Sequence, residues 1–457
     1  MQKRAENKMG VMPVRKLLLS MSIPMMISML VQALYNIVDS IFVAQLNENA
    51  LTAVSLAFPV QTVMIGVGVG TGVGVNSFLS KSLGEKNYGM ANMAAANGIL
   101  LSWISCAVFT IAGFLGSYAF FRAQTDIAEI VEYGADYMSV VCALSFGMFN
   151  QVMLERLLIS TGKTLYSMIS QTLGAIVNII LDPIMIFGLL GCPRMEVFGA
   201  ALATVIGQFV GASAALCFNI RANRDISVRP KDLRLNPGIV KRIYSVGLPS
   251  IMMGSLGSVM IYGFNRILLS FTSTAAAVFG VYFKLNSFIF MPVFGLNNGM
   301  VPIIAYNFGA RNKERIMRTI KLAVTYASVI MLAGTAAFEI FPDKLLRMFN
   351  ASDEMLRLGV PALRTIGLHL PFAGFCIAFL SIFQALGNGM ESLMVAGSRQ
   401  LLFLLPMAWL LSLTGSVNAV WWSFPAAEAA TLALGSFFVR RVYISRIKAI
   451  PDGSDTP

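Results

Sequence analysis

Long apolar segments alternate with short polar connections along the whole chain. About 20 apolar residues are enough for a helix to cross the hydrocarbon core of a bilayer, and every segment reaches that length. The connections are rich in Gly, Asn and charge, as at Ser80–Asn87 and Gly309–Glu314. The pattern therefore predicts an all-α integral membrane protein with twelve transmembrane helices and no soluble domain. The predicted segments are 18–44, 53–79, 91–117, 134–158, 164–190, 196–219, 240–269, 275–305, 318–341, 359–386, 390–413 and 418–443.

The composition excludes several classes of protein. Of 457 residues, 56% are hydrophobic and only 12% are charged, whereas soluble globular proteins carry about 25% charged residues. A disordered chain, a coiled coil and an ordinary cytosolic enzyme are thereby excluded. The five Cys lack disulfide or metal spacing, and the single His, His369, has no ligand-spaced partner. We expect no cofactor and no resident metal, unless Na⁺ binds at the acidic cluster described below.

Basic residues predict the orientation of the chain in the membrane. With the N-terminus inside and alternating helices, the inner side carries 25 Lys and Arg and the outer loops carry five. Because cytoplasmic loops of membrane proteins are enriched in Lys and Arg, both termini are expected to be cytoplasmic. The net charge of +12 is explained in the same way, and no nucleic-acid partner is expected. We predict a multi-pass protein of the cell (inner or plasma) membrane, present as a monomer.

Two halves can be recognised from an internal repeat. Three residue pairs share one offset of 225 positions: Pro24 with Pro249, Gly84 with Gly309, and Gly162 with Gly387. An offset shared by well-separated positions indicates a duplication. Each half holds six helices, so the halves enter the membrane in the same orientation, related by a pseudo-two-fold axis along the membrane normal. The predicted parts are 1–16 (cytoplasmic segment), 17–220 (N-lobe), 221–239 (cytoplasmic linker), 240–443 (C-lobe) and 444–457 (cytoplasmic tail).

Two acids of the N-terminal half lie deep in predicted membrane helices. Asp39 and Asp182 should reach a similar depth in the outer half of the membrane, since both helices run outward. Asn178 lies one helical turn before Asp182, and Thr204 enters the same level from the next helix. Two carboxylates, an amide and a hydroxyl are suitable ligands for a small hard cation or a shared proton. Alternatively, each acid caps a helix end or reaches the outer interface.

The C-terminal half has no acid at the matching positions, which are Phe264 and Met407. It carries Lys284 and Arg399 in apolar segments, with Glu428 as the natural ion-pair partner of one of them. These three residues form either a structural ion pair or a functional polar site.

Further polar and soft side chains are candidates for a substrate cavity between the lobes. Met is flexible and suits promiscuous apolar surfaces, and aromatic faces attract organic cations. For any single Met or Phe, plain packing is the simpler explanation. Two prolines inside predicted helices, Pro24 and Pro183, are candidate hinges. The cavity candidates are Gln32, Tyr35, Asn36, Gln61, Met64, Asn150, Met153, Tyr262 and Asn286.

An ordered set of motifs resembles the multidrug and toxic compound extrusion (MATE) family. The motifs are LYNIVDSIFVAQL, LSKSLGEKNYG, STGKT, NIILDPIMIFG, GAALAT, FMPVFGLNNGMVPIIAYNFGARN and ALGNG. The resemblance covers about residues 13–443. It implies two six-helix lobes, alternating access, and export of organic cations in exchange for H⁺ or Na⁺. In the family branch with an N-lobe cation site, that site would fall on Asp39, Asn178, Asp182 and Thr204.

The resulting hypothesis is a secondary active multidrug efflux antiporter and not an enzyme. Competition would drive it: a proton or Na⁺ from outside neutralises the carboxylates, and the cationic drug is released outward. A flippase or exporter of lipid-linked or anionic substrates is the main alternative, with Lys284 and Arg399 binding a phosphate. A membrane-embedded hydrolase that uses Asp39 and Asp182 as a catalytic pair is a remote one.

Overall fold

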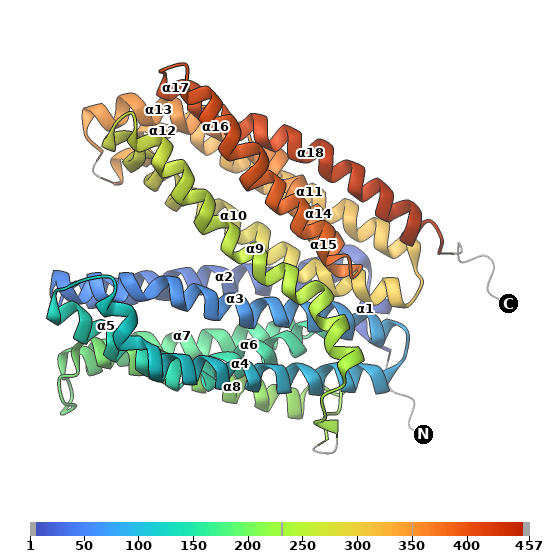
Figure 1. The fold of residues 1–457 in the computed structure, drawn as a ribbon. Helices are drawn as coiled ribbons and strands as arrows, with labels where there is room; N and C mark the ends of the chain where they lie inside the picture. The colour runs from blue at the N-terminus through green and yellow to red at the C-terminus, as the bar shows by residue number, and fades with distance from the viewer. Residues whose placement is uncertain (1–5, 230–231, 350, 451–457) are drawn as a thin grey trace. The chain divides into compact units, whose positions relative to one another are not determined.

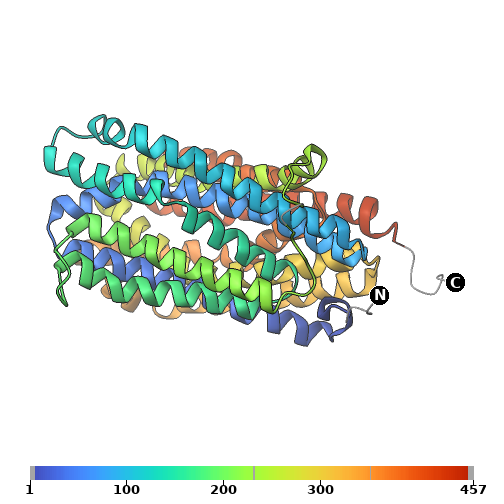
Figure 2. The same cartoon turned by 90° about the horizontal axis from the view of Figure 1, so that it is seen from below.

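The computed structural model describes residues 6–229, 232–349 and 351–450, and every element in this part of the chain is helical (Figure 1 and Figure 2). The N-terminal elements are α1 (Lys8–Val11), α2 (Val14–Ala44), α3 (Glu48–Gly84), α4 (Tyr88–Arg122), α5 (Ala128–Ala143), α6 (Phe146–Ser160), α7 (Thr164–Phe187) and α8 (Glu196–Arg221). The C-terminal elements are α9 (Pro237–Leu269), α10 (Ser273–Gly309), α11 (Lys313–Ile340), α12 (Pro342–Arg347), α13 (Asp353–Gly367), α14 (Leu370–Ala385), α15 (Gly389–Gly397), the π-helix η2 (Ser398–Leu404), α16 (Leu405–Ser412), α17 (Val417–Trp421), α18 (Ser423–Val442) and the π-helix η3 (Tyr443–Ile447).

The helices account for eleven of the twelve predicted spans by length and composition. Nine continuous helices of the described residues are long and apolar enough to cross a membrane. The predicted fourth and tenth spans are bent pairs, α5 with α6 at 46° and α13 with α14 at 49°. The predicted segment 418–443 corresponds to α17 and α18 and is less apolar, because α18 contains Glu428, Arg440 and Arg441.

The chain folds into two compact units, and each unit contains a piece of the other repeat. The first unit comprises the chain up to Val11 together with Ile27–Ile251, and the second comprises Met12–Met26 together with the chain from Met252 onward. Both α2 and α9 therefore change unit along their length, at positions 26 and 251, which again differ by 225. The predicted lobe boundaries differ from these units at residues 17–26 and 240–251.

Small residues explain this exchange of helix ends. Gly70 and Gly74 of α3 lie directly against the backbone of α9 around Gly247, where no side chain would fit. In the second unit Gly295 and Gly299 of α10 lie in the same way against α2, at Met26 and Ser22. Small residues let membrane helices approach closely enough for van der Waals packing, which replaces the hydrophobic effect between helices in lipid.

The repeat predicted from the sequence is confirmed by the local backbone. Helices α3 and α10 both contain 37 residues, and each begins after a capping side chain, Asn47 or Thr272. Both helices end at a repeat-matched glycine, Gly84 or Gly309. Further matched pairs have left-handed backbone, with φ of 85° at Gly162 and 81° at Gly387, and of 56° at Lys86 and 54° at Arg311.

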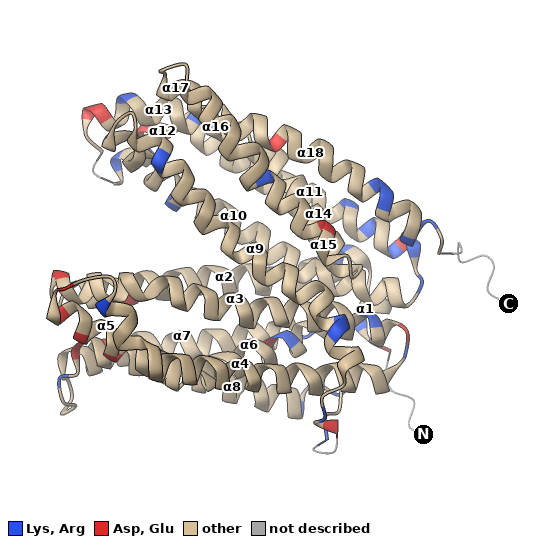
Figure 3. Cartoon of the chain, in the orientation of Figure 1, with Lys and Arg blue, Asp and Glu red and all other residues tan. Residues whose placement is uncertain are grey.

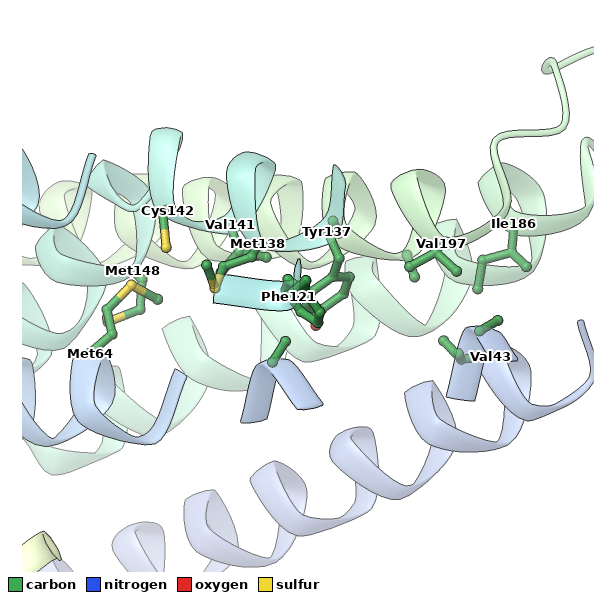
Figure 4. Close-up of a cluster of buried hydrophobic side chains, with 14 of the residues drawn as sticks. Val43, Met64, Phe121, Tyr137, Met138, Val141, Cys142, Met148, Ile186 and Val197 are labelled. Carbon is green, nitrogen blue, oxygen red and sulfur yellow. The ribbon is translucent and has the colours of Figure 1, made fainter. Parts of the chain in front are cut away.

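The cores of the two units differ in composition. Figure 4 shows the core cluster of the first unit, in which Met64 and Met148 lie at one end and Val43, Ile186 and Val197 at the other. The second unit instead has a cluster of tilted and edge-on rings around Phe264, which contacts Phe279, Trp421 and Phe424. The fully buried Phe264 occupies the position that matches Asp39 in the repeat.

The described part of the N-terminal segment is bound to the first unit by hydrogen bonds. Asn7 donates hydrogen bonds to the Thr161 carbonyl at 3.0 Å and to Asp225 at 3.1 Å, and Lys163 forms an ion pair with Asp225 at 3.0 Å. Burial, together with the charge of Lys163, lowers the pKa of Lys8 below its ordinary value.

The linker is fixed in a similar way by Asn97 of α4. Its side chain donates to the Arg234 carbonyl and accepts from the Asn236 backbone amide. Residues 1–5, 230–231 and 451–457 of the predicted terminal segments and linker lie outside the described residues.

The charges of the first unit are distributed unequally between its two ends. Figure 3 shows Lys and Arg gathered at the end of the first unit where α1 lies and mainly Asp and Glu at the opposite end. This distribution agrees with the excess of basic residues on the predicted inner loops.

Candidate functional site

Asp182, Asn178 and Thr204 form a hydrogen-bonded group between α7 and α8. The Asn178 amide donates to Asp182 Oδ1 at 3.2 Å and lies 3.4 Å from Thr204 Oγ1. Asn178 and Asp182 are buried and stand one turn apart on α7, as the spacing predicts. Three of the four residues predicted for the cation site are therefore brought together.

Asp39 reaches the same level from α2. The ring of Phe42 on α2 lies edge-on to the ring of Phe187 on α7, with centroids 6.4 Å apart, so the C-terminal ends of the two helices meet there. Asp39 lies close enough to Asp182 for their charges to interact. A second carboxylate, from a different helix, therefore lies within electrostatic reach of the hydrogen-bonded group.

The oxygen atoms of this group are incompletely satisfied. Asp39 Oδ1, Asn178 Oδ1 and Asp182 Oδ2 are buried and have no hydrogen-bond partner in the described part of the chain. Buried carboxylates are costly unless they are neutralised or bind a cation. Two acidic oxygens and an amide oxygen that lack partners can bind a proton or a small hard cation. We refer to Asp39, Asn178, Asp182 and Thr204 as the acidic cluster.

Close packing of α7 on α8 places these side chains. A Cβ atom on Gly174 would lie 2.7 Å from the Gly207 carbonyl oxygen, and the reciprocal distance is also 2.7 Å. Asn178 follows Gly174 by one turn, and Thr204 precedes Gly207 by one turn, so the seam directs both polar side chains toward one another. Pro183 lies within α7 beside Asp182.

Several predicted cavity residues of the first unit make polar contacts with neighbouring helices. Gln32 accepts a hydrogen bond from Gln171 at 3.4 Å, and Tyr35 lies within electrostatic reach of Asp39. Gln61 donates to the Tyr137 hydroxyl at 3.0 Å, and together with Met64 it lines a narrow pocket between α3 and α5.

Other predicted cavity residues have a different environment. Asn150 accepts from the Trp103 indole at 3.0 Å. Met153 is a buried core residue packed beside Gly98, whereas Asn36 is exposed. In the second unit Tyr262 is 70% exposed, and Asn286 Oδ1 is buried without a partner among the described residues.

Two charged residues inside the predicted segment 134–158, the half-buried Glu155 and the buried Arg156, were not among the predicted site residues. Glu155 and Arg156 lie within α6. Glu155 accepts from Gln151 at 3.1 Å and from Ser170 at 3.4 Å, and it is within electrostatic reach of Tyr35. The Arg156 side chain packs on the bare backbone of Gly72. The signal was available, because both charges border an apolar segment.

The predicted trio of the second unit is only partly assembled. Arg399 Nη1 lies 3.7 Å from Glu428 Oε1, so the expected ion pair involves Arg399. Lys284 is exposed, and its Nζ lies 5.9 Å from the ring centroid of Phe349. No ion pair joins Lys284 to Glu428 in the described part of the chain, and the three-residue polar site stays a prediction.

Comparisons with known proteins agree over nearly the whole chain. A family model described as MatE matches residues 24–184 and 249–410. The multidrug export protein MepA of Staphylococcus haemolyticus is 27% identical over 425 residues, covering 93% of each chain. MepA of Staphylococcus aureus is 28% identical over 457 residues, covering 97% of this chain and 96% of that protein.

Solved structures show the same similarity. The outward-facing structure of a multidrug resistance MATE family transporter of the MOP superfamily has a TM-score of 0.90 at 26% identity, covering 98% of this chain and 100% of that one. A MOP superfamily transporter from Pyrococcus furiosus has a TM-score of 0.89, also at 26% identity, with the same coverage.

Proposed function

This chain belongs to the MatE family of multidrug and toxic compound extrusion transporters, and from this premise we propose that it is a secondary active antiporter. It is a multidrug efflux transporter with the all-helical, twelve-helix, two-lobe architecture of its family, and not an enzyme. The finer proposal is that it exports organic, mostly cationic, compounds in exchange for H⁺ or Na⁺. The family assignment does not include ion-driven exchange, and this proposal adds that H⁺ or Na⁺ drives transport.

The acidic cluster is the single observation that carries the proposal. Its two carboxylates have buried oxygens without a partner in the described part of the chain. They are also within electrostatic reach of each other. Such a group gains from binding one positive charge, whether a proton, Na⁺ or the charged nitrogen of a drug. We propose that Asp39, Asn178, Asp182 and Thr204 bind the coupling ion, without any cofactor.

We propose that competition between the coupling ion and the drug for the acidic cluster drives the transport cycle. An ion shifts a conformational equilibrium only by its different affinity for the two states. In the state open to the cytoplasm, the ionised aspartates attract the cationic drug. Binding of H⁺ or Na⁺ from outside removes that attraction, and the drug leaves outward. Pro24 and Pro183 interrupt the backbone hydrogen bonds of α2 and α7 and are the proposed hinges.

The remaining assignments follow from charge and residue type. The basic end of the first unit supports cytoplasmic termini in a cell membrane. The proposed partners are small organic cations and the lipid bilayer, and the proposed form is a monomer. Gln32 and Tyr35 of α2 and Gln61 of α3 are the proposed cavity residues of the first unit, because they carry polar atoms on two neighbouring segments of the chain.

The test measures ethidium efflux by the protein reconstituted into liposomes in a controlled orientation. A pH gradient is imposed in one experiment and a Na⁺ gradient in a separate one. One of the two gradients should drive ethidium transport that empty liposomes do not show. If the ethidium flux is the same with either gradient as without any gradient, antiport is contradicted, and the family assignment remains intact.

A further inference from the structure

One charged residue lies inside a membrane helix of the first unit but outside the acidic cluster. Glu155 belongs to α6, within the predicted membrane segment 134–158. Charged side chains are costly in the hydrocarbon region of a bilayer, and those that occur there usually mark a binding site or a transport pathway. The side chain of Glu155 is half-buried, so part of it stays accessible. These properties make Glu155 a candidate ligand-binding group.

One oxygen of the Glu155 carboxylate is held by neighbouring side chains, and the other is not. Oε1 accepts hydrogen bonds from Gln151 at 3.1 Å and from Ser170 of α7 at 3.4 Å, whereas Oε2 accepts none from the described residues. Arg156, the next residue, is within electrostatic reach, but its side chain extends along Gly72 of α3. No ion pair of the described residues involves Glu155. Neutral donors thus orient the carboxylate and leave one oxygen for a ligand.

Further polar side chains extend from Glu155 toward the acidic cluster along α2 and α7. Gln171 of α7 donates a hydrogen bond to Gln32 of α2 at 3.4 Å. Tyr35 lies about one turn after Gln32, and it is within electrostatic reach of both Glu155 and Asp39. The side chains of Gln32, Tyr35 and Gln171 are half-buried, as that of Glu155 is. A polar and partly accessible face therefore connects Glu155 with the acidic cluster.

Glu155 is nevertheless too far from the acidic cluster to belong to it. Ser170, which donates to Glu155, precedes Asp182 on α7 by 12 residues, a length of about 18 Å in an α-helix. Helix α6 ends at Ser160, shortly after Glu155, at the predicted cytoplasmic end of the first unit. A compound that enters from the cytoplasm would reach Glu155 before it reaches the acidic cluster.

The second unit shows that the fold does not require these polar side chains. Helices α6 and α7 pack on each other in the first unit, and the matching helices α14 and α15 do the same in the second. Apolar or weakly polar residues occupy the matching positions there. The residues that match Gln32, Tyr35, Gln151, Glu155, Ser170 and Gln171 are Gly257, Met260, Cys376, Leu380, Val395 and Ala396. Helix packing alone therefore does not explain the polar set of the first unit.

We propose that Glu155 is the anionic group of an inner cation site in the first unit, which binds the charged nitrogen of an organic cation before that cation reaches the acidic cluster. This proposal rests on the proposed export of organic cations and adds a binding site for them. Hydrogen bonds to Oε1 fix the direction of the free oxygen, and a positively charged ligand offsets the cost of a carboxylate in the membrane. Gln32 and Gln171 supply uncharged polar groups nearby.

The separation of the two sites gives the proposal a specific consequence. An ion at the acidic cluster does not occupy the free oxygen of Glu155. The Asp39→Asn/Asp182→Asn variant should therefore still bind ethidium, because the inner cation site remains. We expect this remaining ethidium binding to depend on the charge of Glu155.

The experiment is equilibrium binding of ethidium to the purified full-length protein in lipid nanodiscs at fixed pH, followed by fluorescence anisotropy. In the Asp39→Asn/Asp182→Asn background, addition of Glu155→Gln should weaken ethidium binding by about tenfold or more, as expected for a lost charged contact. Glutamine can accept the same hydrogen bonds, so the variant should fold. Glu132→Gln removes the same charge from an exposed position of the first unit and is the matched control. The control should leave the affinity unchanged.

A second measurement tests the site in the parent protein without any substitution. A carbodiimide modifies accessible carboxyl groups, and mass spectrometry locates the modified residues. Glu155 should be modified in the absence of ethidium and protected by saturating ethidium, whereas modification of Glu132 should be the same in both conditions. Failure to modify Glu155 would contradict an accessible oxygen, and modification without protection would contradict ethidium binding there.

Ser170→Ala distinguishes binding from helix packing. This variant removes one hydrogen bond to Glu155 but no charge, so it should weaken ethidium binding less than Glu155→Gln does. Equal losses in the two variants would overturn the proposal, because Glu155 would then act through packing.

Two further outcomes would overturn the proposal. One is an unchanged ethidium affinity in Glu155→Gln. The other is a Glu155→Gln variant that loses binding of Na⁺ but keeps binding of ethidium, since the site would then hold the small ion. Failure of the proposed antiport is distinguishable. Ethidium bound at Glu155 in a protein without ion-driven efflux would contradict antiport alone, and ion-driven efflux with unchanged binding in Glu155→Gln would contradict the inner cation site alone.

Discussion

The two units use one scaffold for different chemistry. At the four positions of the acidic cluster, the second unit has Phe264, Phe403, Met407 and Ala429. Helix lengths, caps and left-handed turns are nevertheless conserved between the repeats, as α3 and α10 show. The backbone therefore does not depend on the acids, and their presence in one unit only is consistent with a functional role.

The opposite exchange occurs at the helix seam. The first unit packs Gly174 against Gly207, whereas the second unit carries Arg399 and a π-helix at the matching place. Each unit thus has one place where polar groups replace packing residues, and the two places do not coincide. Substitutions at these places test whether the division of roles is real.

The largest expected effect is that of Asp39→Asn. It removes one of the two charges of the acidic cluster, so ion-driven ethidium efflux should fall to the level of empty liposomes while membrane expression is maintained. Asp136→Asn, which alters an exposed acid of the same unit, is the control and should leave efflux intact. Full efflux by Asp39→Asn would contradict a functional role for the acids that only the first unit carries.

Asp182→Asn should have a smaller effect. The substituted side chain can still accept the hydrogen bond from Asn178, and Asp39 remains. We expect efflux to slow about tenfold, which corresponds to about 1.4 kcal/mol of lost ion binding. Efflux rates at several Na⁺ concentrations and pH values would measure it. Unchanged ion dependence would exclude Asp182 from the site.

Phe264→Ala should lower stability without affecting the chemistry of the first unit. The side chain is fully buried among Phe279, Trp421 and Phe424. Removing a buried phenyl ring typically costs about 3–5 kcal/mol. Thermal unfolding in detergent should show the loss, with Phe437→Ala, which is 63% exposed, as the control. Equal stability of the two variants would contradict a structural role at position 264.

The smallest effects are expected at the matched glycines Gly162 and Gly387. Both have positive φ, which costs a residue with a side chain about 1–2 kcal/mol. Gly162→Ala should be somewhat more destabilising, because its Cβ would lie 3.1 Å from the Lys8 side chain, whereas the Gly387 site is open. Unfolding temperatures of the two variants measure this, and a larger loss for Gly387→Ala would contradict the repeat geometry.

Much of the fold could be predicted because it depends on regular signals. The glycines at 84, 162, 309 and 387 have the same offset in the sequence and similar roles in the structure. The helix breaks after Ala143 and Gly367 were not predicted, since both lie inside continuous apolar segments and the first contains no proline. The π-helix at Arg399 was not predicted either, although Pro406 stands at the start of the following helix α16.

The candidate site was predictable for a related reason. Asn178 and Asp182 are one turn apart on a single helix, so their contact follows from helix geometry. The partner of Arg399 required the packing of η2 on α18, and the position of Lys284 depended on Phe349 in a distant loop. Residues that meet through tertiary packing are not ordered by any period in the sequence.

The most direct test of the central claim is equilibrium binding of ethidium to the purified protein during titration with Na⁺ and with acid. If ion and drug compete for the acidic cluster, one of the two titrations will weaken ethidium binding in the parent protein, and the Asp39→Asn/Asp182→Asn variant will show no such competition. Ethidium affinity that is independent of both Na⁺ and pH in the parent protein would contradict the account.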